Sequence, residues 1–361
     1  MKRICFVFII SLCLAAQVSA EPNSKAALLK TQLKAVDSVT NGILTLYIDK
    51  DSPYAGTFTV ATGPDHPHPN ENVLYGGSLR VPGTSYLTVR SYTSRTDYIS
   101  SGGSPSSDFQ VVKLHNYLQS VARIGNTGYK TVWVVRGNDA LTIEQLTVIE
   151  GTTLDDTLVR VTTTVKNDGS SPVKIGIRYE WDWKIDNSDN SVIKRHNPDD
   201  EDFTSEFFEE TPPHFEYYEE TGISGSEPGP GITGGTYLDW SVFGSVNGPS
   251  ALDPPPTPPD RFNYSSWWSA YLNAWTFQVT GGGTDSAVCY YWGDTESNAI
   301  VLAPGESYTV TQYITTFKKA LKPKPATPKP VNAPTLTQWG LILLILSICT
   351  MALLKLGGAE R

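Results

Sequence analysis

Cysteine and basic residues are scarce in this sequence, and both shortages narrow what the protein can be. Of four cysteines in 361 residues, Cys5, Cys13 and Cys349 lie in apolar runs at the two ends, and only Cys289 lies between them. No intramolecular disulfide can therefore stabilise the middle of the chain, which must be held by its own core. Of 28 basic and 37 acidic residues, nine basic and one acidic lie outside residues 21–317. This body keeps 19 basic and 36 acidic residues, a net charge of −17 that repels nucleic acid.

Several catalytic motifs are also missing. The sequence has no Gly-x-Ser-x-Gly, His-Glu-x-x-His or Walker motif, and Cys289 has no catalytic signature around it. These absences exclude the common serine-hydrolase elbow, the zinc-peptidase helix and the P-loop. The sequence therefore leaves catalysis open, with no catalytic residue that we can name.

The N-terminus has the layout of a secretory signal peptide. Lys2 and Arg3 precede an apolar run over residues 6–16, and small residues follow at Val18 and Ala20. This pattern predicts export through the inner membrane, with residues 1–20 removed between Ala20 and Glu21. The alternative is a retained membrane anchor, although the apolar run is short for a bilayer span.

The C-terminus predicts a stalk followed by a membrane anchor. Residues 318–333 are rich in Pro, Lys and Ala, a composition that favours extended polyproline II structure. Residues 339–354 are apolar and begin at Trp339, an aromatic residue suited to a membrane interface. At about 1.5 Å per residue, this run forms a transmembrane helix of roughly 24 Å.

Residues 334–361 also resemble a known family. Their sequence is similar to the IPTL-CTERM sorting signal of Gram-negative bacteria, through Pro334, Thr335, Leu336, Trp339 and Gly340. It departs from the family pattern at Ala333 and Thr337 and has a weakly basic tail. The resemblance implies sorting to the cell envelope or surface by a dedicated membrane enzyme. An ordinary single-pass anchor is the alternative.

The body between these ends predicts an all-β fold. About a dozen segments alternate apolar and polar residues and are separated by Gly, Pro, Asn and Asp, with one short helix expected over residues 26–36. This pattern predicts a large antiparallel β-sandwich, or two smaller ones. Residues 199–259 carry dense acidic and Pro-rich stretches, and they predict a long excursion outside the sandwich.

The most informative stretch runs from residue 158 to residue 190. Two alternating segments, 158–165 and 173–183, flank the turn 167–171 and predict a hairpin. The stretch resembles hairpins of bacterial surface sandwich domains and of galactose-mutarotase-like supersandwich proteins. That resemblance implies a supersandwich-like body. The paired His and late Glu of mutarotase catalysis are not visible, so the activity does not carry over.

On the second of these segments, charged residues share one face. Arg178 and Asp182 lie there with Lys174 and Glu180, opposite an apolar and aromatic face. One interpretation is a solvated face with cross-strand ion pairs. The other makes Arg178 and Asp182 the floor of a polar, sugar-binding groove.

Two groups of residues could bind a metal ion. Asp182, Asp186 and Asp189 offer the hard oxygen ligands that Ca²⁺ prefers, although their spacing does not match an EF-hand loop. Asp-rich turns also form without an ion. His66 and His68 project to the same side of an extended chain and could share a metal, or simply belong to a Pro-rich turn.

Aromatic residues supply the last candidates. Trp267, Trp268 and Trp292 either belong to the core or form a platform for sugar stacking. We therefore expect an exported envelope protein with a structural or polysaccharide-binding role. The alternatives are a carbohydrate-active enzyme, of mutarotase-like or glycoside-processing type, and a Ca²⁺-stabilised adhesin.

The signal-peptide assignment makes a direct prediction. When the full chain is expressed in a Gram-negative host, the mature protein should begin at Glu21 because Ala20 completes the cleavage site. Mass spectrometry of the N-terminal peptide measures this. A mature protein that retains residues 1–20 would contradict the assignment.

Overall fold

The structure is a computed structural model that describes most of the chain from residue 36 to residue 321. The described range has gaps at residues 52, 77–79, 138, 187, 190, 197–200, 205–207, 211–214, 225–235 and 280–284. The expected signal peptide, nearly all of the expected helix 26–36, the stalk beyond residue 321 and the sorting signal lie outside the described residues. None of the helices in the described part of the chain combines the length and the hydropathy that a membrane span needs.

The described chain is almost entirely β-structure, as the alternation predicts. Its strands are β1 (Val36–Thr40), β2 (Leu44–Asp49), β3 (Phe58–Thr62), β4 (Tyr86–Ser91), β5 (Thr96–Ile99), β6 (Gln110–Lys113), β7 (Leu118–Ile124), β8 (Gly128–Val135), β9 (Leu141–Glu150), β10 (Leu158–Asn167), β11 (Val173–Asp182), β12 (Ser191–His196), β13 (Glu201–Thr204), β14 (Phe208–Glu210), β15 (Tyr217–Ser224), β16 (Thr236–Ser245), β17 (Arg261–Ser266), β18 (Ser286–Trp292), β19 (Ile300–Leu302) and β20 (Ser307–Thr315). The described helical segments are η1 (Leu114–Tyr117), α3 (Trp267–Tyr271) and η2 (Lys318–Leu321).

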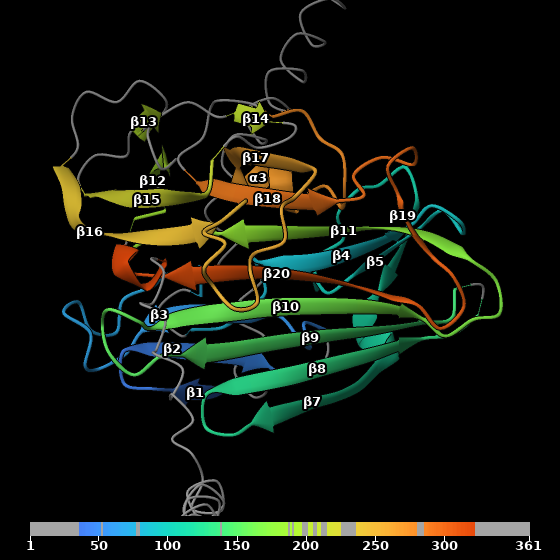
Figure 1. Cartoon of the computed structure of the whole chain (residues 1–361), viewed down its shortest axis with the longest axis horizontal. Helices are drawn as coiled ribbons and strands as arrows, with labels where there is room; N and C mark the ends of the chain where they lie inside the picture. The colour runs from blue at the N-terminus through green and yellow to red at the C-terminus, as the bar shows by residue number, and fades with distance from the viewer. Residues whose placement is uncertain are drawn as a thin grey trace, which may run out of the picture. The chain divides into compact units, whose positions relative to one another are not determined.

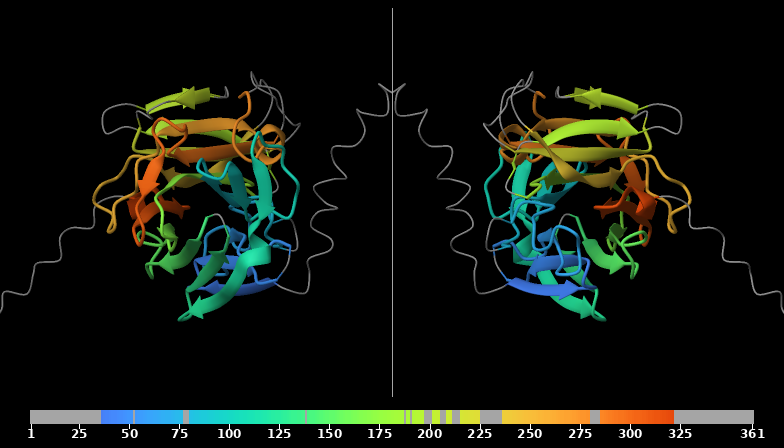
Figure 2. Two further views of the ribbon diagram at one scale, coloured as in Figure 1. Left: turned by 90° about the vertical axis from the view of Figure 1, so that its right-hand side faces the viewer. Right: turned by 90° about the vertical axis from the view of Figure 1, so that its left-hand side faces the viewer.

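These strands form three sheets (Figures 1 and 2). A nine-stranded antiparallel sheet has the order β13-β12-β15-β16-β20-β10-β9-β8-β7. An eight-stranded sheet has the order β14-β17-β18-β11-β4-β5-β6, with β19 beside β11, and its β5–β6 pair is parallel. The third sheet is β1-β2-β3. All described residues belong to one unit, so the body is one large sandwich and not two small ones.

The core lies between the two large sheets. Strand β9 shows the pattern, because every second residue from Leu141 to Ile149 is buried while the residues that alternate with them are half-exposed. Residues of all three sheets share this core, including Leu46 and Ile177. The register of each strand is thereby fixed, since a slip by one residue would turn its apolar side chains outward.

The predicted hairpin is wrong, and the structure has an arch in its place. Strand β10 pairs with β9 and β20 of the nine-stranded sheet, whereas β11 pairs with β4 and β18 of the other sheet. Asn167 holds the turn by donating to the carbonyl oxygens of Ser171 at 2.8 Å and Leu302 at 2.9 Å. The chain crosses between layers here because both strands have an apolar face to bury. Tyr179 and Thr163 then meet through their hydroxyls at 2.5 Å across the core.

The predicted excursion over residues 199–259 is also corrected. Strands β15 and β16 of this segment belong to the nine-stranded sheet, and β16 pairs with β20. Tyr218 and Val242 are fully buried, while Glu216 and Glu219 are half-exposed. Burial alternates along β15, so Tyr218 faces the core while Tyr217 and Glu219 are half-exposed on the other face.

Glu220 lies on the buried face of β15, two residues after Tyr218, and its carboxyl group is fully buried. It lies against the Ser191 hydroxyl, which is 2.9 Å from the Ser286 hydroxyl on the facing sheet. Tyr264 closes this group by donating to the Ser191 carbonyl oxygen at 2.7 Å. Burial raises the pKa of Glu220 to about 8, so the carboxyl group is protonated at neutral pH.

This buried acid should make stability fall as pH rises. The folded state holds a proton that the unfolded chain releases above its ordinary carboxyl pKa, so stabilisation is present below that pKa and is lost as pH rises through about 8. Between pH 5 and pH 8 the loss should be about 3 kcal/mol. Glu220→Gln should remove this component of the pH dependence, as measured by denaturant unfolding at both pH values. Equal pH dependence in the two proteins would contradict the assignment.

Candidate functional site

The candidate site is the face of β4, β11, β18 and β17 that points away from the nine-stranded sheet, here called the outer face. The strand register sets its side chains in rows, each read from β4 through β11 and β18 to β17. One row holds Thr88, Arg178, Tyr291 and Arg261, and the next holds Tyr86, Glu180, Cys289 and Asn263. A third row places Asp182, Ala287 and Ser265 side by side.

A later segment of the chain covers this face. We call residues 267–278, which begin with α3, the strap. Its Trp267, Ala270, Tyr271 and Trp275 form a second apolar cluster with outer-face residues: Tyr86, Ala287, Cys289 and Tyr291. The amide of Trp267 donates to the Asp285 carbonyl oxygen at 2.8 Å, which fixes the start of the strap.

Gly176 makes room for the strap at one end of the outer face. A Cβ at this position would lie 2.7 Å from the Trp275 ring and 2.5 Å from the carbonyl oxygen of Gly293. Such distances are shorter than van der Waals contact, so any larger residue would displace Trp275. The Trp275 indole nitrogen in turn donates to the Asp294 carbonyl oxygen at 3.0 Å.

Arg178 holds the strap from below. Its Nη2 donates to the carbonyl oxygen of Ala270 at 2.7 Å, and its Nη1 donates to those of Asn273 at 2.7 Å and Ala274 at 3.1 Å. Nη1 also donates to the Tyr86 hydroxyl at 3.0 Å, and Nη2 lies 3.2 Å from Cys289 Sγ. The Ala270 carbonyl lies in the last turn of α3, where it has no partner within the helix, and those of Asn273 and Ala274 follow the helix end, so the buried cation satisfies them directly.

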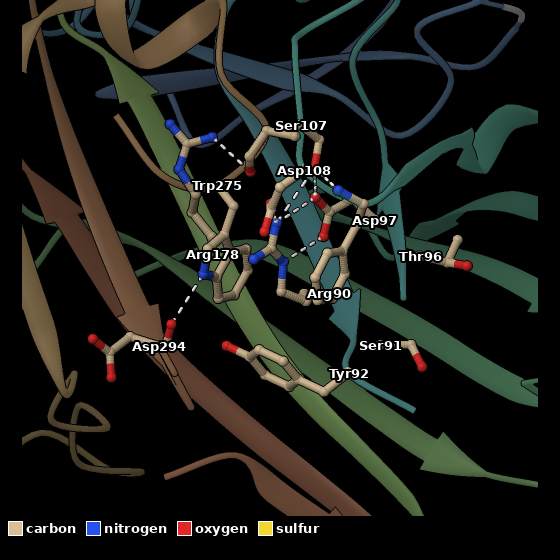
Figure 3. Close-up of polar contacts among 12 residues, drawn as sticks. Arg90, Ser91, Tyr92, Thr96, Asp97, Ser107, Asp108, Arg178, Trp275 and Asp294 are labelled. Atoms are coloured by element: carbon tan, nitrogen blue, oxygen red, sulfur yellow. Dashed lines mark hydrogen bonds and ion pairs between the residues drawn. The ribbon is translucent and has the colours of Figure 1, made fainter. Parts of the chain in front are cut away.

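Arg90 holds the neighbouring loop, residues 100–109, as Arg178 holds the strap (Figure 3). Its guanidinium donates two bonds of 2.8 Å to the buried Asp97 carboxylate and a third of 2.8 Å to Asp108. It also lies 3.9 Å from the Phe109 ring centroid and 4.8 Å from that of Trp275. Arg90 therefore contacts both covering segments.

The loop and the strap are joined to each other. The Ser106 amide donates to the Leu272 carbonyl oxygen at 2.7 Å, and the Ala274 amide donates to the Ser106 carbonyl oxygen at 2.9 Å. Two segments distant in sequence thus form one cover over the outer face.

Burial controls the chemistry beneath this cover. It raises the pKa of the Cys289 thiol to about 11 and that of the Tyr291 hydroxyl to about 12. The pKa of Tyr86 is raised as well, by the same desolvation. All three groups stay protonated at neutral pH, so Cys289 is a small buried hydrophobe and not a nucleophile.

Arg178 and Asp182 lie on the same face of β11, as the alternation predicts. Both interpretations of that face, a solvated face and the floor of an open groove, are wrong. Both side chains are fully buried, so the face is neither solvated nor an open groove floor. The reason is the strap, which follows Arg178 by about ninety residues in the sequence and turns a polar face into an interior. Arg178 bonds protein carbonyls there, in the place of a ligand.

The three tryptophans do not form one exposed platform. Trp292 is buried in the main core on the opposite face of the sheet, stacked at 5.9 Å on Tyr290. Trp267 and Trp268 are in contact, with ring centroids 5.6 Å apart, but Trp267 is buried between the strap and the outer face while Trp268 is 36% exposed. Alternation along β18 sends Trp292 into the core, so Trp268 is the one tryptophan of the three with an exposed ring.

The three aspartates predicted to bind Ca²⁺ are separated too. Asp182 points beneath the strap, Asp189 pairs with Lys184 at 3.1 Å, and the Asp186 carboxyl group lies beside Glu71. That contact raises the pKa of Glu71 to about 7. Among the described residues, no group of three His, Cys, Asp or Glu side chains could hold a metal ion.

The histidine pair is occupied by other contacts. His66 Nδ1 accepts from the His68 amide at 2.9 Å, and its Nε2 lies 3.0 Å from the Thr316 hydroxyl. Burial lowers the pKa of His66 to about 4, so its ring is neutral. The His68 ring stacks on Trp240 with centroids 5.4 Å apart.

Sequence reasoning missed Arg90, Asn263 and Ser265. Each occupies a polar position in a strand with apolar neighbours, a pattern that also fits a solvated face. These positions are buried only because the cover, formed by the strap and residues 100–109, lies over them. The sole signal was the dense aromatic run that contains Trp267, Trp268 and Tyr271.

Comparisons with known proteins assign no family to this chain. No protein-family model matches the chain, and no curated protein sequence matches it. Among solved structures, it is similar to a galactose mutarotase-like protein from Lactobacillus casei, with 10% identity over 78% of this chain and 99% of that one, and a TM-score of 0.44. A galactose mutarotase related enzyme from Lactobacillus acidophilus matches with 8% identity over 80% and 100%, and a TM-score of 0.42.

A third similar structure is a GH36 alpha-galactosidase from Geobacillus stearothermophilus. It shares 9% identity over 77% of this chain and 40% of that one, with a TM-score of 0.38. Similarities of this size assign neither a family nor an activity to the chain.

Removing the guanidinium of Arg178 should loosen the strap. Arg178→Met keeps an apolar stem but leaves the carbonyl oxygens of Ala270 and Ala274 without this donor, while that of Asn273 keeps only the Tyr86 hydroxyl. Unfolding should therefore cost about 3 kcal/mol less. Limited proteolysis should then cut within residues 267–278 before any other segment. The control is Arg160→Met, which breaks a surface pair with Glu150 and should cost less than about 1 kcal/mol. Equal effects from the two variants would show that Arg178 has no special role.

Proposed function

We propose that this chain is an exported protein of a Gram-negative cell envelope that binds polysaccharide without catalysis. In this proposal the signal peptide and the sorting signal deliver the sandwich to the envelope, and the Pro/Lys-rich stalk holds it away from the membrane. The surface that binds sugar is the outside of the cover, formed by the strap and residues 100–109.

The observation that carries this proposal is the exposure of Trp268. A tryptophan that is 36% exposed beside a buried, stacked Trp267 and Tyr271 offers an apolar ring on a rigid base. The apolar face of a sugar ring packs on such a ring. The cover also has exposed polar residues that can hydrogen-bond to sugar hydroxyls: Ser104, Ser106, Thr276 and Gln278.

Charge narrows the class of polysaccharide. Residues 21–317 carry a net charge of −17, which disfavours acidic polymers. A neutral polysaccharide is therefore the expected ligand. The sugars on either side of the one that stacks on Trp268 would lie along the cover, because stacking on a single aromatic ring binds weakly.

The enzyme alternative receives less support from the site. Glu180 and Asp182 lie two residues apart on one face of β11, a spacing of about 7 Å that suits paired carboxylates. Both are fully buried beneath the strap, where a polysaccharide does not reach them. Binding at the exposed surface therefore accounts for more of the structure than hydrolysis does.

The test compares substitutions at two exposed residues, Trp268 in α3 and Leu272 directly after it. Trp268→Ala should lower affinity for the best ligand on a neutral glycan array at least tenfold, because the stacking ring is lost. Leu272→Ala removes a side chain of nearly equal exposure, 37%, and should leave affinity within about twofold. Both variants should unfold at the wild-type temperature. Unchanged glycan binding by Trp268→Ala would refute the proposed surface.

A further inference from the structure

Lys113 is the last residue of β6, the strand at one edge of the eight-stranded sheet. It lies in register with Ile99 of β5, and its side chain is half-buried. Its Nζ donates a hydrogen bond to the carbonyl oxygen of Ser101 at 3.2 Å. Because Ser101 belongs to residues 100–109, this bond holds the amine of Lys113 against the cover.

No carboxylate balances the charge of this amine. Among the residues that the structure describes, Lys113 Nζ donates to the Ser101 carbonyl oxygen and forms no ion pair with Asp or Glu. Other lysines of this acidic body do find one, since Lys130 pairs with Glu144 at 2.9 Å and Lys50 pairs with Asp37 at 3.2 Å. A half-buried ammonium with one neutral acceptor has lost part of its hydration without gaining a counter-charge. The site therefore favours the neutral amine over the ammonium.

This surrounding changes the protonation of Lys113. Burial lowers the pKa of Lys113 to about 8, and no charged group among the described residues adds to this effect. At pH 7.5, roughly a quarter of the molecules then carry a neutral amine there, against about 0.1% for a lysine with the ordinary pKa of about 10.4. The neutral amine is the nucleophilic form of lysine.

A second titratable group lies close to Lys113. His115 follows it in η1, and burial together with the charge of Lys113 lowers the pKa of His115. Its ring is therefore neutral at pH 7.5, and its buried Nδ1 has no hydrogen-bond partner within the described part of the chain. A neutral imidazole can accept a proton that a neighbouring nucleophile releases. His115 thus brings a base to the amine instead of a second positive charge.

We propose that Lys113 is a reactive amine that captures small aldehydes as an imine. Its neutral nitrogen attacks the carbonyl carbon, a C–N bond forms, and one proton passes from the nitrogen to the former carbonyl oxygen. The C–O bond then breaks, and the oxygen leaves as water with the second proton of the nitrogen. The reaction needs neither an oxidant nor a reductant. Because the side chain is half-buried, the site admits a small carbonyl compound and excludes a polymer.

Reductive trapping measures this reaction directly. The mature protein is incubated at pH 7.5 with glycolaldehyde and sodium cyanoborohydride, which reduces the imine to a stable amine, and peptide mass spectrometry follows each lysine. Lys113 should be modified at least tenfold faster than Lys130, although the Lys130 side chain is 41% exposed and more accessible. The ratio of the two rates should fall as pH rises above about 9, because the amine of Lys113 is then already neutral.

The unfolded chain supplies the matched control. In concentrated urea the burial is lost, so Lys113 and Lys130 should react at rates within about twofold of each other. Lys113→Arg should remove the fast adduct from the folded protein, whereas Lys130→Arg should retain it. Equal rates at the two lysines in the folded wild type, or a preference for Lys113 that persists in urea, would overturn the proposal. Both measurements use the wild-type chain, and neither depends on glycan binding.

Discussion

The covered outer face depends on one interaction, the bonding of the buried Arg178 guanidinium to three carbonyl oxygens of the strap. A buried guanidinium is costly unless its donors are satisfied, and carbonyl oxygens that are shielded from water are costly unless they find a donor. The hydrogen bonds from Arg178 to these carbonyl oxygens, at 2.7–3.1 Å, satisfy both groups. Gly176 admits Trp275, and Arg90 binds the second covering segment, so the two arginines together close the face.

Much of the fold could be read from the sequence, because period-two alternation reports which face of a strand is buried. It placed Ile177 and Tyr179 in the core and Arg178 opposite them, as the structure confirms. It could not tell a hairpin from an arch, since both turns look alike and only the pairing partners differ. It also could not reveal that a polar face is interior, because the strap comes from far along the chain.

Because the outer face is covered, its polar residues are not accessible to a large ligand. The polar residues that would have lined an open groove are buried beneath the strap. The surface left for a large ligand is the cover itself, where Trp268 is exposed while Trp267 supports it.

The central claim is that the strap is locked to the sheet, and amide hydrogen exchange on the wild-type protein tests it most directly. The amides of Trp267, Leu272 and Ala274 each donate a backbone hydrogen bond. If Arg178 fixes this segment, they should exchange as slowly as the amides of β18, in the range set by global unfolding. Exchange near the rate of an unstructured peptide, while β18 stays protected, would show that the strap opens freely and would contradict the account.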